Sequence, residues 1–170
     1  MTDLHRPLYH FTAPQNWIND PNGLIQVNGV YHLFYQHNPD GPFWGDIHWG
    51  HARSTDLFHW EHLPLAMAPD QPYDNFGVFS GCAVLNNGTP TVVYTGVQKD
   101  AYGTQLPCVA TSDDDLITWH KHPANPVIAQ APAGVSPDNF RDHSIWKEGD
   151  AWFMVMGASF QGKTGAALIY

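Results

Sequence analysis

One unit of sequence recurs along this chain with a period of about sixty residues. Each copy is an apolar stretch, a turn with a glycine, and a run of β-branched and aromatic residues. The three copies read LIQVNGVYHLFYQ, AVLNNGTPTVVYTG and SIWKEGDAWFMVMG, and their turn glycines are Gly29, Gly88 and Gly149. Asn-Gly between alternating apolar runs is a strong hairpin signal. The sequence therefore predicts three β-hairpins that are copies of one structural unit, with strands near 30–36, 91–97 and 151–158.

A second marker, Asp-Leu-x-x-Trp, repeats with the hairpins at residues 56–60 and 115–119. No segment sustains a helical period, so the predicted fold class is all-β. A repeat of this size with several strands is typical of β-propeller blades, which have four strands each. The marker is then expected at the turn into each outermost strand.

The same period predicts how much of a propeller the chain holds. Residues 1–170 are expected to form one N-terminal portion of a propeller domain, with blades one and two and most of blade three. Closed propellers have typically four to eight blades. The chain is therefore expected to be a fragment or to assemble with other chains.

Composition excludes several functional classes. With 43% hydrophobic and 14% charged residues, the chain has the composition of a folded globular protein. A formal charge of -9 with seven Lys and Arg argues against nucleic-acid binding, which depends on clustered cations. Neither a signal-peptide pattern nor a long apolar run is found, which predicts a cytoplasmic protein with no membrane partner. Seven tryptophans suggest platforms for ring-shaped ligands such as carbohydrate.

Cysteine and histidine patterns give no support for a metal or a cofactor. Cys82 and Cys108 lie in apolar surroundings without C-x-x-C spacing, and they are interpreted as buried free thiols. Among the eleven histidines, His48 and His51 form the only close pair that looks like ligands, and no Cys or carboxylate completes a recognisable spacing. The prediction is no metal and no cofactor.

The stretch WINDPNG, residues 17–23, has the composition of a tight turn. It precedes the first hairpin, as FSG (79–81) precedes the second and FRD (140–142) the third. In a propeller the first strand of each blade lines the central channel, so these polar clusters are expected to converge. Two aspartates, an arginine and a serine in one pocket, with a tryptophan nearby, match the needs of glycoside chemistry.

These motifs carry a family resemblance. WINDPNG, the following YHLFYQHNPDGPFWGDIHWGHARSTDLFHWEHLPLAMAPD, FSGCAV and FRDHSIW resemble glycoside hydrolase family 32 from about residue 7 to the end. That family comprises invertases, inulinases and sucrose-6-phosphate hydrolases, which are five-bladed β-propellers. The resemblance implies retaining hydrolysis of terminal β-D-fructofuranosides such as sucrose or short fructans.

The resemblance also implies roles for individual residues. Asp20 matches the nucleophile, with its carboxylate expected to accept hydrogen bonds from N–H groups of its turn. Asp142 matches the transition-state stabiliser that binds fructose hydroxyls, and Arg141 lies beside it. The sugar-binding wall would comprise Asn19, Gln36, Trp44, Phe79 and Ser80.

Some tryptophans can also be interpreted as structural residues and not as sugar-binding ones. Trp44 could instead be a plain blade-core residue, and Trp49, Trp60 and Trp119 are interpreted as core or blade-turn residues.

Two departures from the family pattern affect the prediction. His143 follows Asp142 where the family has proline, which places a titratable ring, expected to protonate near pH 6.5, beside the carboxylate. The family's acid/base glutamate lies in a Glu-Cys motif, and neither Glu61 nor Glu148 is in such a motif. The isolated chain is therefore expected to be inactive on sucrose and to self-associate or need a complementing polypeptide.

Other functions stay open at this point. A non-catalytic truncated fructoside-binding or vestigial fragment is the main alternative, and related five-bladed families cleave arabinosides or polymerise fructose. The preferred fructoside, whether sucrose, sucrose phosphate, inulin or levan, is not determined by these residues.

Overall fold

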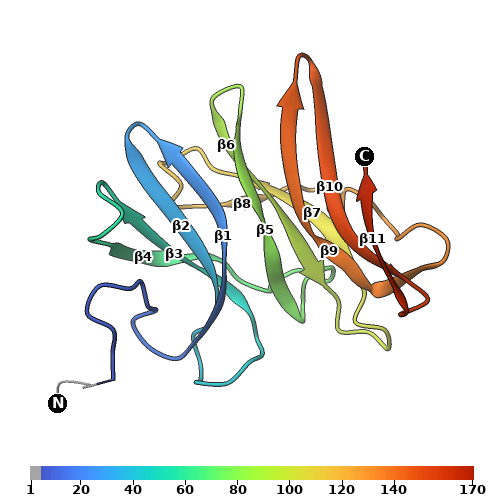
Figure 1. Ribbon diagram of the computed structural model, residues 1–170, viewed down its shortest axis with the longest axis horizontal. Helices are drawn as coiled ribbons and strands as arrows, with labels where there is room; N and C mark the ends of the chain where they lie inside the picture. The colour runs from blue at the N-terminus through green and yellow to red at the C-terminus, as the bar shows by residue number, and fades with distance from the viewer. Residues whose placement is uncertain (1–4) are drawn as a thin grey trace.

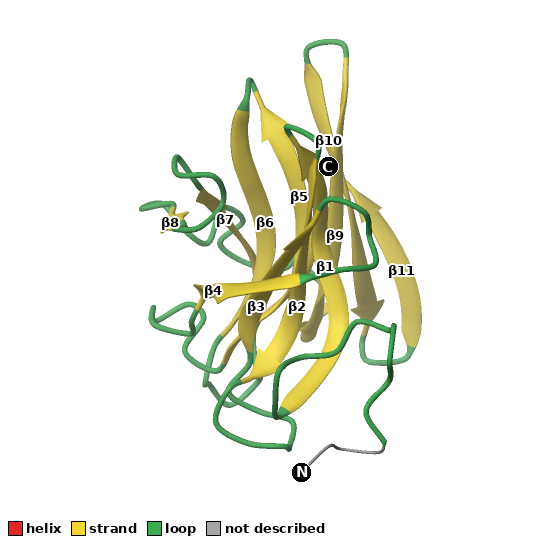
Figure 2. Ribbon diagram, turned by 90° about the vertical axis from the view of Figure 1, so that its left-hand side faces the viewer, coloured by secondary structure: helices red, strands yellow, loops and turns green. Residues whose placement is uncertain are grey.

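The computed structural model describes residues 5–170, and that range consists of strands and loops without any helix (Figures 1 and 2). The predicted all-β class is therefore confirmed. Among these residues there is accordingly no helix long and apolar enough to cross a membrane. The strands are β1 (Trp17–Val27), β2 (Val30–Asn38), β3 (His48–Ser54), β4 (Glu61–Met67), β5 (Gly77–Asn86), β6 (Thr89–Val97), β7 (Gln105–Thr111), β8 (His120–Lys121), β9 (Val135–Glu148), β10 (Ala151–Phe160) and β11 (Thr164–Ile169).

Three antiparallel sheets follow one another along the chain. The first has the order β1-β2-β3-β4, the second β5-β6-β7-β8, and the third β9-β10-β11. Each sheet begins with a hairpin, and these are the three hairpins that the repeat predicts. In Figure 1 the sheets stand side by side from the blue N-terminal part to the red C-terminal part. Their first strands are neighbours, since β5 contacts both β1 and β9.

Turn chemistry explains why the hairpins form where they do. Asn28 and Gly29 have φ of 51° and 81°, and Asn87 and Gly88 have φ of 50° and 86°. Positive φ at both central residues defines a type I′ turn, for which Asn-Gly is the preferred pair. The backbone twist of this turn matches the twist of the flanking strands, so sequence and local geometry agree.

The Asp-Leu-x-x-Trp marker forms the same turn in two sheets, as predicted. Leu57 and Leu116 both have φ of 66°. Trp60 Nε1 donates to the Leu57 carbonyl at 3.1 Å, and Trp119 Nε1 donates to the Leu116 carbonyl at 3.0 Å. Each turn leads directly into the last strand of its sheet, β4 or β8.

Apolar side chains pack in layers between neighbouring sheets. The cluster between the first and second sheets includes the fully buried Phe34, Trp49 and Tyr94. A smaller cluster between the second and third sheets includes Phe140 and Met156. Burial of this apolar surface is the main force that holds the sheets face to face.

The free thiols and the predicted core tryptophans follow the same layering. Cys108 is buried and Cys82 half-buried, both unpaired. Trp49 is fully buried, as predicted, while Trp119 packs against the cluster between the first and second sheets and Trp60 against a smaller one around Tyr35.

The interpretation of residues 17–23 as a tight turn is wrong, because all of WINDPNG lies in β1. Turn-type residues fit this strand because it is irregular and lies at a sheet edge. Pro21 lacks an N–H but sits on an edge strand, where proline is tolerated. Gly23 has φ of 57° at a register shift between Asn22 and Ile25, where the conformation favours glycine.

Candidate active site

A β-bulge interrupts the first strand of every sheet, and each bulge holds a predicted site residue. In β1 the register shifts between Ile18 and Pro21, a segment that contains Asn19 and Asp20. In β5 the shift between Phe79 and Gly81 leaves Ser80 as the extra residue. Bulges bend a strand and redirect side chains, and they are frequent next to active sites.

The third bulge lies in β9, between Arg141 and Ser144, and contains Asp142 and His143. Asp142 has φ of 58°, a left-handed conformation that is uncommon for a residue other than glycine. Such backbone strain persists only where the surrounding structure supports it, and it is frequent at functional sites.

The three bulges open onto one hollow of about 370 Å³. Asp20, Ser80 and Asp142 all line it, so the convergence expected from the sequence is present. A larger hollow of about 420 Å³ lies beside Lys121, next to β4 and β8, the outermost strands of the first two sheets. The smaller hollow is the candidate site because both carboxylates face it. Its lining is completed by Pro21, Asn22, Gly81 and His143.

Asp20 is exposed, and side chains hold its carboxylate from two strands. Ser80 Oγ donates to Oδ2 at 2.9 Å, and Asn19 Nδ2 donates to Oδ1 at 3.3 Å. Asn19 is itself oriented by Trp17, whose Nε1 donates to Asn19 Oδ1 at 2.7 Å. Within the described part of the chain, the donors to Asp20 are thus side chains and not the backbone N–H groups that the sequence suggested.

Asp142 has a mixed electrostatic environment, with its side chain 55% exposed. Partial burial raises the pKa of Asp142, the charge of Asp20 adds to the rise, and the Arg141 guanidinium opposes it. Arg141 Nε lies 3.3 Å from Asp142 Oδ2. The charge of Asp20 is therefore close enough to influence the ionisation of Asp142.

Arg141 and Asp142 have supporting residues that the sequence analysis did not single out. The buried Gln105 accepts a hydrogen bond from Arg141 Nη1 at 3.2 Å through Oε1. The buried Thr95 accepts one from the Asp142 backbone N–H at 3.3 Å. Thr95 lies in the strand predicted near 91–97, where nothing distinguishes it from an ordinary strand residue, and Gln105 lies in β7, a strand that was not predicted.

The aromatic residues of the predicted sugar-binding wall, Trp44 and Phe79, contact each other but are not among the residues that line the hollow. Trp44 is 50% exposed, which rules out the alternative of a core tryptophan. Its ring lies edge-on to Phe79, with centroids 6.0 Å apart, and at the same separation from Phe76. Gln36 is instead buried, and its amide donates to the Val78 carbonyl at 2.9 Å.

The expectation of a protonating ring beside Asp142 is wrong for His143. The side chain is 2% exposed, and burial lowers the pKa of His143 to about 4. The ring is therefore neutral near pH 6.5 and adds no charge to the site. Neither ring nitrogen of His143 nor the side-chain amide of the buried Asn22 has a hydrogen-bond partner in the described residues.

The predicted histidine pair does not form a ligand set. His51 is buried and shares a hydrogen bond of 3.0 Å with His32, whereas His48 Nδ1 lies 2.6 Å from the Asp46 carbonyl. Residues 5–170 contain no group of three His, Cys, Asp or Glu side chains that could hold a metal ion.

Paired carboxylates that open onto one hollow, with an arginine and an exposed tryptophan, define a candidate glycoside hydrolase site. The chain belongs to glycosyl hydrolases family 32, whose N-terminal domain it matches over residues 10–170.

Similar proteins carry related names. The chain is 45% identical to the sucrose-6-phosphate hydrolase of Escherichia coli over 96% of its own length and 34% of that protein. It is 45% identical to the acid beta-fructofuranosidase of Vicia faba over all of its own length and 27% of that protein. The chain thus spans about a third of the length of the first of these relatives and about a quarter of the second.

Solved structures agree with this assignment. Fructan 1-exohydrolase IIa from Cichorium intybus matches with a TM-score of 0.86 at 43% identity, covering 95% of this chain and 31% of that one. The Bombyx mori GH32 beta-fructofuranosidase BmSUC1 matches with a TM-score of 0.86 at 39% identity, covering 97% of this chain and 34% of that one.

Proposed function

We propose that this chain provides part of the catalytic domain of a retaining hydrolase that acts on terminal β-D-fructofuranosides, such as sucrose or short fructans. The observation that carries the proposal is the convergence of Asp20 and Asp142 on one hollow, from bulges in neighbouring sheets. The names of relatives, which include a sucrose-6-phosphate hydrolase and a fructan exohydrolase, support the substrate class.

The proposed reaction proceeds in two steps. The ionised Asp20 attacks the anomeric carbon of the fructosyl unit, and the glycosidic oxygen leaves with a proton from a general acid. Water then gives up a proton to the same group, which now acts as the base, and attacks the fructosyl ester, which releases fructose and restores both the Asp20 carboxylate and the protonated acid. Asp142 and Arg141 would hold the sugar hydroxyls, and the exposed face of Trp44 would contact the ring.

The architecture proposed for the whole domain is the five-bladed propeller that the resemblance implies, with the three sheets as blades one to three. Self-association, a complementing polypeptide and a cytoplasmic location stay predictions. A non-catalytic fructoside-binding role is the alternative, and a direct assay separates it from hydrolysis.

The test is the substitution Asp20→Ala in the natural protein that carries this chain. We expect hydrolysis of sucrose and of inulin-type fructans to fall by at least about a thousandfold, because the covalent nucleophile is removed. The control is Asp150→Ala, which changes an exposed carboxylate in the turn between β9 and β10. Circular dichroism of each preparation checks the fold. Activity of Asp20→Ala within tenfold of the parent would contradict the assigned role, and a parent that binds fructosides without cleaving them would favour the alternative.

A further inference from the structure

Thr95 on β6 is a buried residue that touches two of the three bulges. Its side chain has no exposed surface. Oγ1 donates to the Ser80 carbonyl at 3.0 Å and accepts from the Asp142 N–H at 3.3 Å. A hydroxyl has one donor and two acceptor sites, so both bonds form at the same time.

These bonds complete a continuous connection from the Asp20 carboxylate to the Asp142 backbone. Ser80 Oγ donates to Asp20, the Ser80 carbonyl accepts from Thr95, and Thr95 accepts from the backbone of Asp142. The connection runs from the first sheet through the second to the third. The apolar packing between these sheets is not directional, and their other polar contacts, such as Gln36 to Val78 and Arg141 to Gln105, do not join one bulge to another. The hydroxyl of Thr95 therefore adds directional contacts at the place where orientation matters.

Both backbone groups that Thr95 binds belong to bulges. A bulge leaves backbone groups without a ladder partner, and a buried backbone group without any hydrogen-bond partner is destabilising. Asp142 also has the strained φ of 58°, which the surrounding structure has to maintain. A side-chain acceptor at its N–H does this without occupying the carboxylate.

We propose that Thr95 is a positioning residue that fixes the Asp142 bulge relative to Asp20, so that both carboxylates meet one fructosyl ring. This inference rests on the proposed function. Because misplacement of a reacting group by about 1 Å can reduce turnover by roughly a hundredfold, loss of the connection should appear in catalysis before it appears in folding.

The test compares three variants of the natural protein that carries this chain. Thr95→Val keeps the shape and removes the hydroxyl, whereas Thr95→Ser keeps the hydroxyl. Thr91→Val is the matched control, because Thr91 lies on the same strand and its Oγ1 donates to the Thr89 carbonyl away from the site. Measurements are kcat and KM on sucrose, the thermal midpoint, and a crystal structure of each variant.

We expect Thr95→Val to lower kcat/KM by about 10- to 100-fold, with Thr95→Ser within about threefold of the parent and Thr91→Val unchanged. The Asp142 carboxylate should move relative to Asp20 in the Thr95→Val structure and keep its place in the other two. Should Thr95→Val not fold, Thr95→Cys, with its weak sulfur donor, replaces it in the comparison with Thr95→Ser.

Several results would overturn the inference. A kcat/KM of Thr95→Val equal to that of the parent would do so. An equal decrease of kcat/KM in Thr95→Val and Thr95→Ser would also do so, as would a decrease in Thr95→Val that is fully explained by the fraction of unfolded protein. A parent with no fructosidase activity would refute the proposed function and not this inference, since the carboxylate positions in the variant structures still decide it.

Discussion

Asp142 and His143 share one bulge but have opposite surroundings. Asp142 faces the hollow, where the Asp20 charge and partial burial raise its pKa, while the ring of His143 is enclosed. Burial disfavours the charged form in both cases, and for a histidine this means a lower pKa. The difference matters because only Asp142 takes part in the proposed chemistry.

We expect His143 to make folding sensitive to acid. Its pKa is lowered to about 4 in the folded chain, whereas an unfolded histidine titrates near 6.5. The unfolded state therefore binds more protons between these values, so stability is complete above about pH 6.5 and falls as the pH drops toward 4. From pH 7 to pH 5 the loss from this residue is about 2 kcal/mol.

Urea unfolding of the parent and of His143→Leu, at pH 7 and pH 5, measures this contribution. Leu has a similar volume and does not titrate, so the variant should lose about 2 kcal/mol less than the parent between the two pH values. Equal losses would show that the ring is protonated in both states or in neither.

A bulge in the first strand of each sheet places the site residues. In the second sheet the residue after the bulge is Gly81, and a Cβ there would collide with the Val93 carbonyl oxygen and approach Tyr94 Cα to 2.7 Å. Both obstacles are backbone atoms of β6, so a side chain could not be accommodated by a rotamer change. Gly81 thus permits the close strand approach that presents Ser80 to Asp20.

We therefore expect Gly81→Ala to destabilise the fold by about 1–3 kcal/mol or more and to reduce fructoside hydrolysis in the protein that carries the chain. Gly165→Ala on β11 is the control, since its added Cβ has no neighbour within 4 Å and should change stability by less than about 0.5 kcal/mol. Urea midpoints of the two variants test the comparison, and similar midpoints would contradict it.

The hairpins and turns could be predicted from the sequence, whereas the bulges and the contacts between strands of different sheets could not. Period, turn glycines and the Asp-Leu-x-x-Trp marker identified the hairpins and outer turns because these depend on local backbone chemistry. Residues 17–23 were misinterpreted because Asn, Pro and Gly are used alike by turns and by bulged edge strands. Thr95 and Gln105 were missed because their roles depend on which strands become neighbours, and a period of two does not contain that information.

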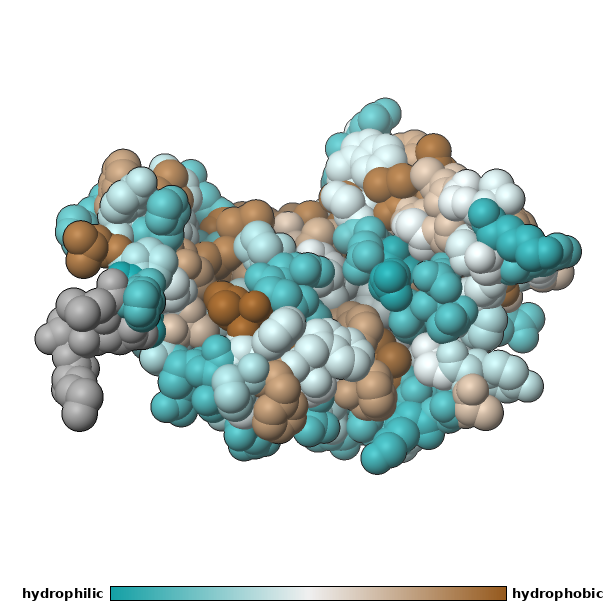
Figure 3. Space-filling model, turned by 60° about the horizontal axis from the view of Figure 1, so that its bottom comes forward, coloured by the Kyte–Doolittle hydropathy of each residue, from teal (hydrophilic) through white to brown (hydrophobic). Residues whose placement is uncertain are grey.

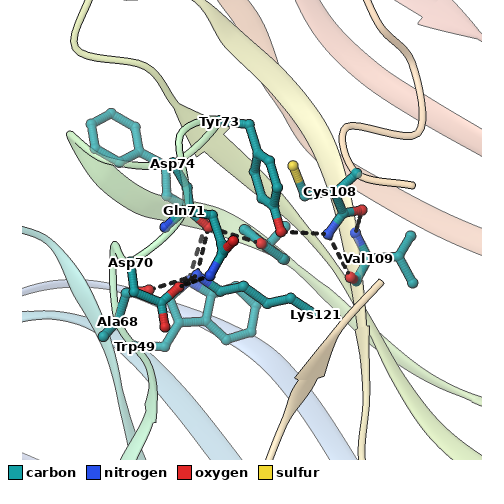
Figure 4. A network of polar contacts seen from close by, with 12 residues as sticks. Trp49, Ala68, Asp70, Gln71, Tyr73, Asp74, Cys108, Val109 and Lys121 are labelled. Carbon is teal, nitrogen blue, oxygen red and sulfur yellow. Dashed lines mark hydrogen bonds and ion pairs between the residues drawn. The ribbon is translucent and has the colours of Figure 1, made fainter. Parts of the chain in front are cut away.

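Across the whole molecule, the first two sheets are joined at their far ends by a polar contact as well as by the core (Figure 4). Lys121 on β8 donates from Nζ to Asp74 at 2.6 Å, to Asp70 at 2.7 Å and to the Ala68 carbonyl at 2.6 Å. Asp74 is fully buried in the segment between β4 and β5, and it also accepts from Tyr94 Oη at 3.0 Å. On the face drawn in Figure 3, apolar and hydrophilic side chains are interspersed.

The Lys121–Asp74 pair should be worth more to the fold than a surface ion pair. Breaking a buried pair leaves an uncompensated charge, so we expect Lys121→Met to lower the free energy of unfolding by about 3–5 kcal/mol. Arg53→Met is the control, because Arg53 and Glu61 pair at 2.7 Å with side chains 40% and 60% exposed. Loss of such an exposed pair should be destabilising by less than about 1 kcal/mol.

A double variant separates charge from packing. In Lys121→Met with Asp74→Asn the buried charge disappears, while the asparagine oxygen can still accept from Tyr94. We expect the double variant to unfold at a higher urea concentration than Lys121→Met alone, since removal of both charges avoids the isolated carboxylate. A double variant that is no more stable than Lys121→Met would contradict this expectation. It would mean that Lys121 stabilises the fold through its aliphatic packing and its bonds to Ala68 and Asp70. It would also mean that groups other than Lys121 compensate the charge of Asp74 in the folded chain.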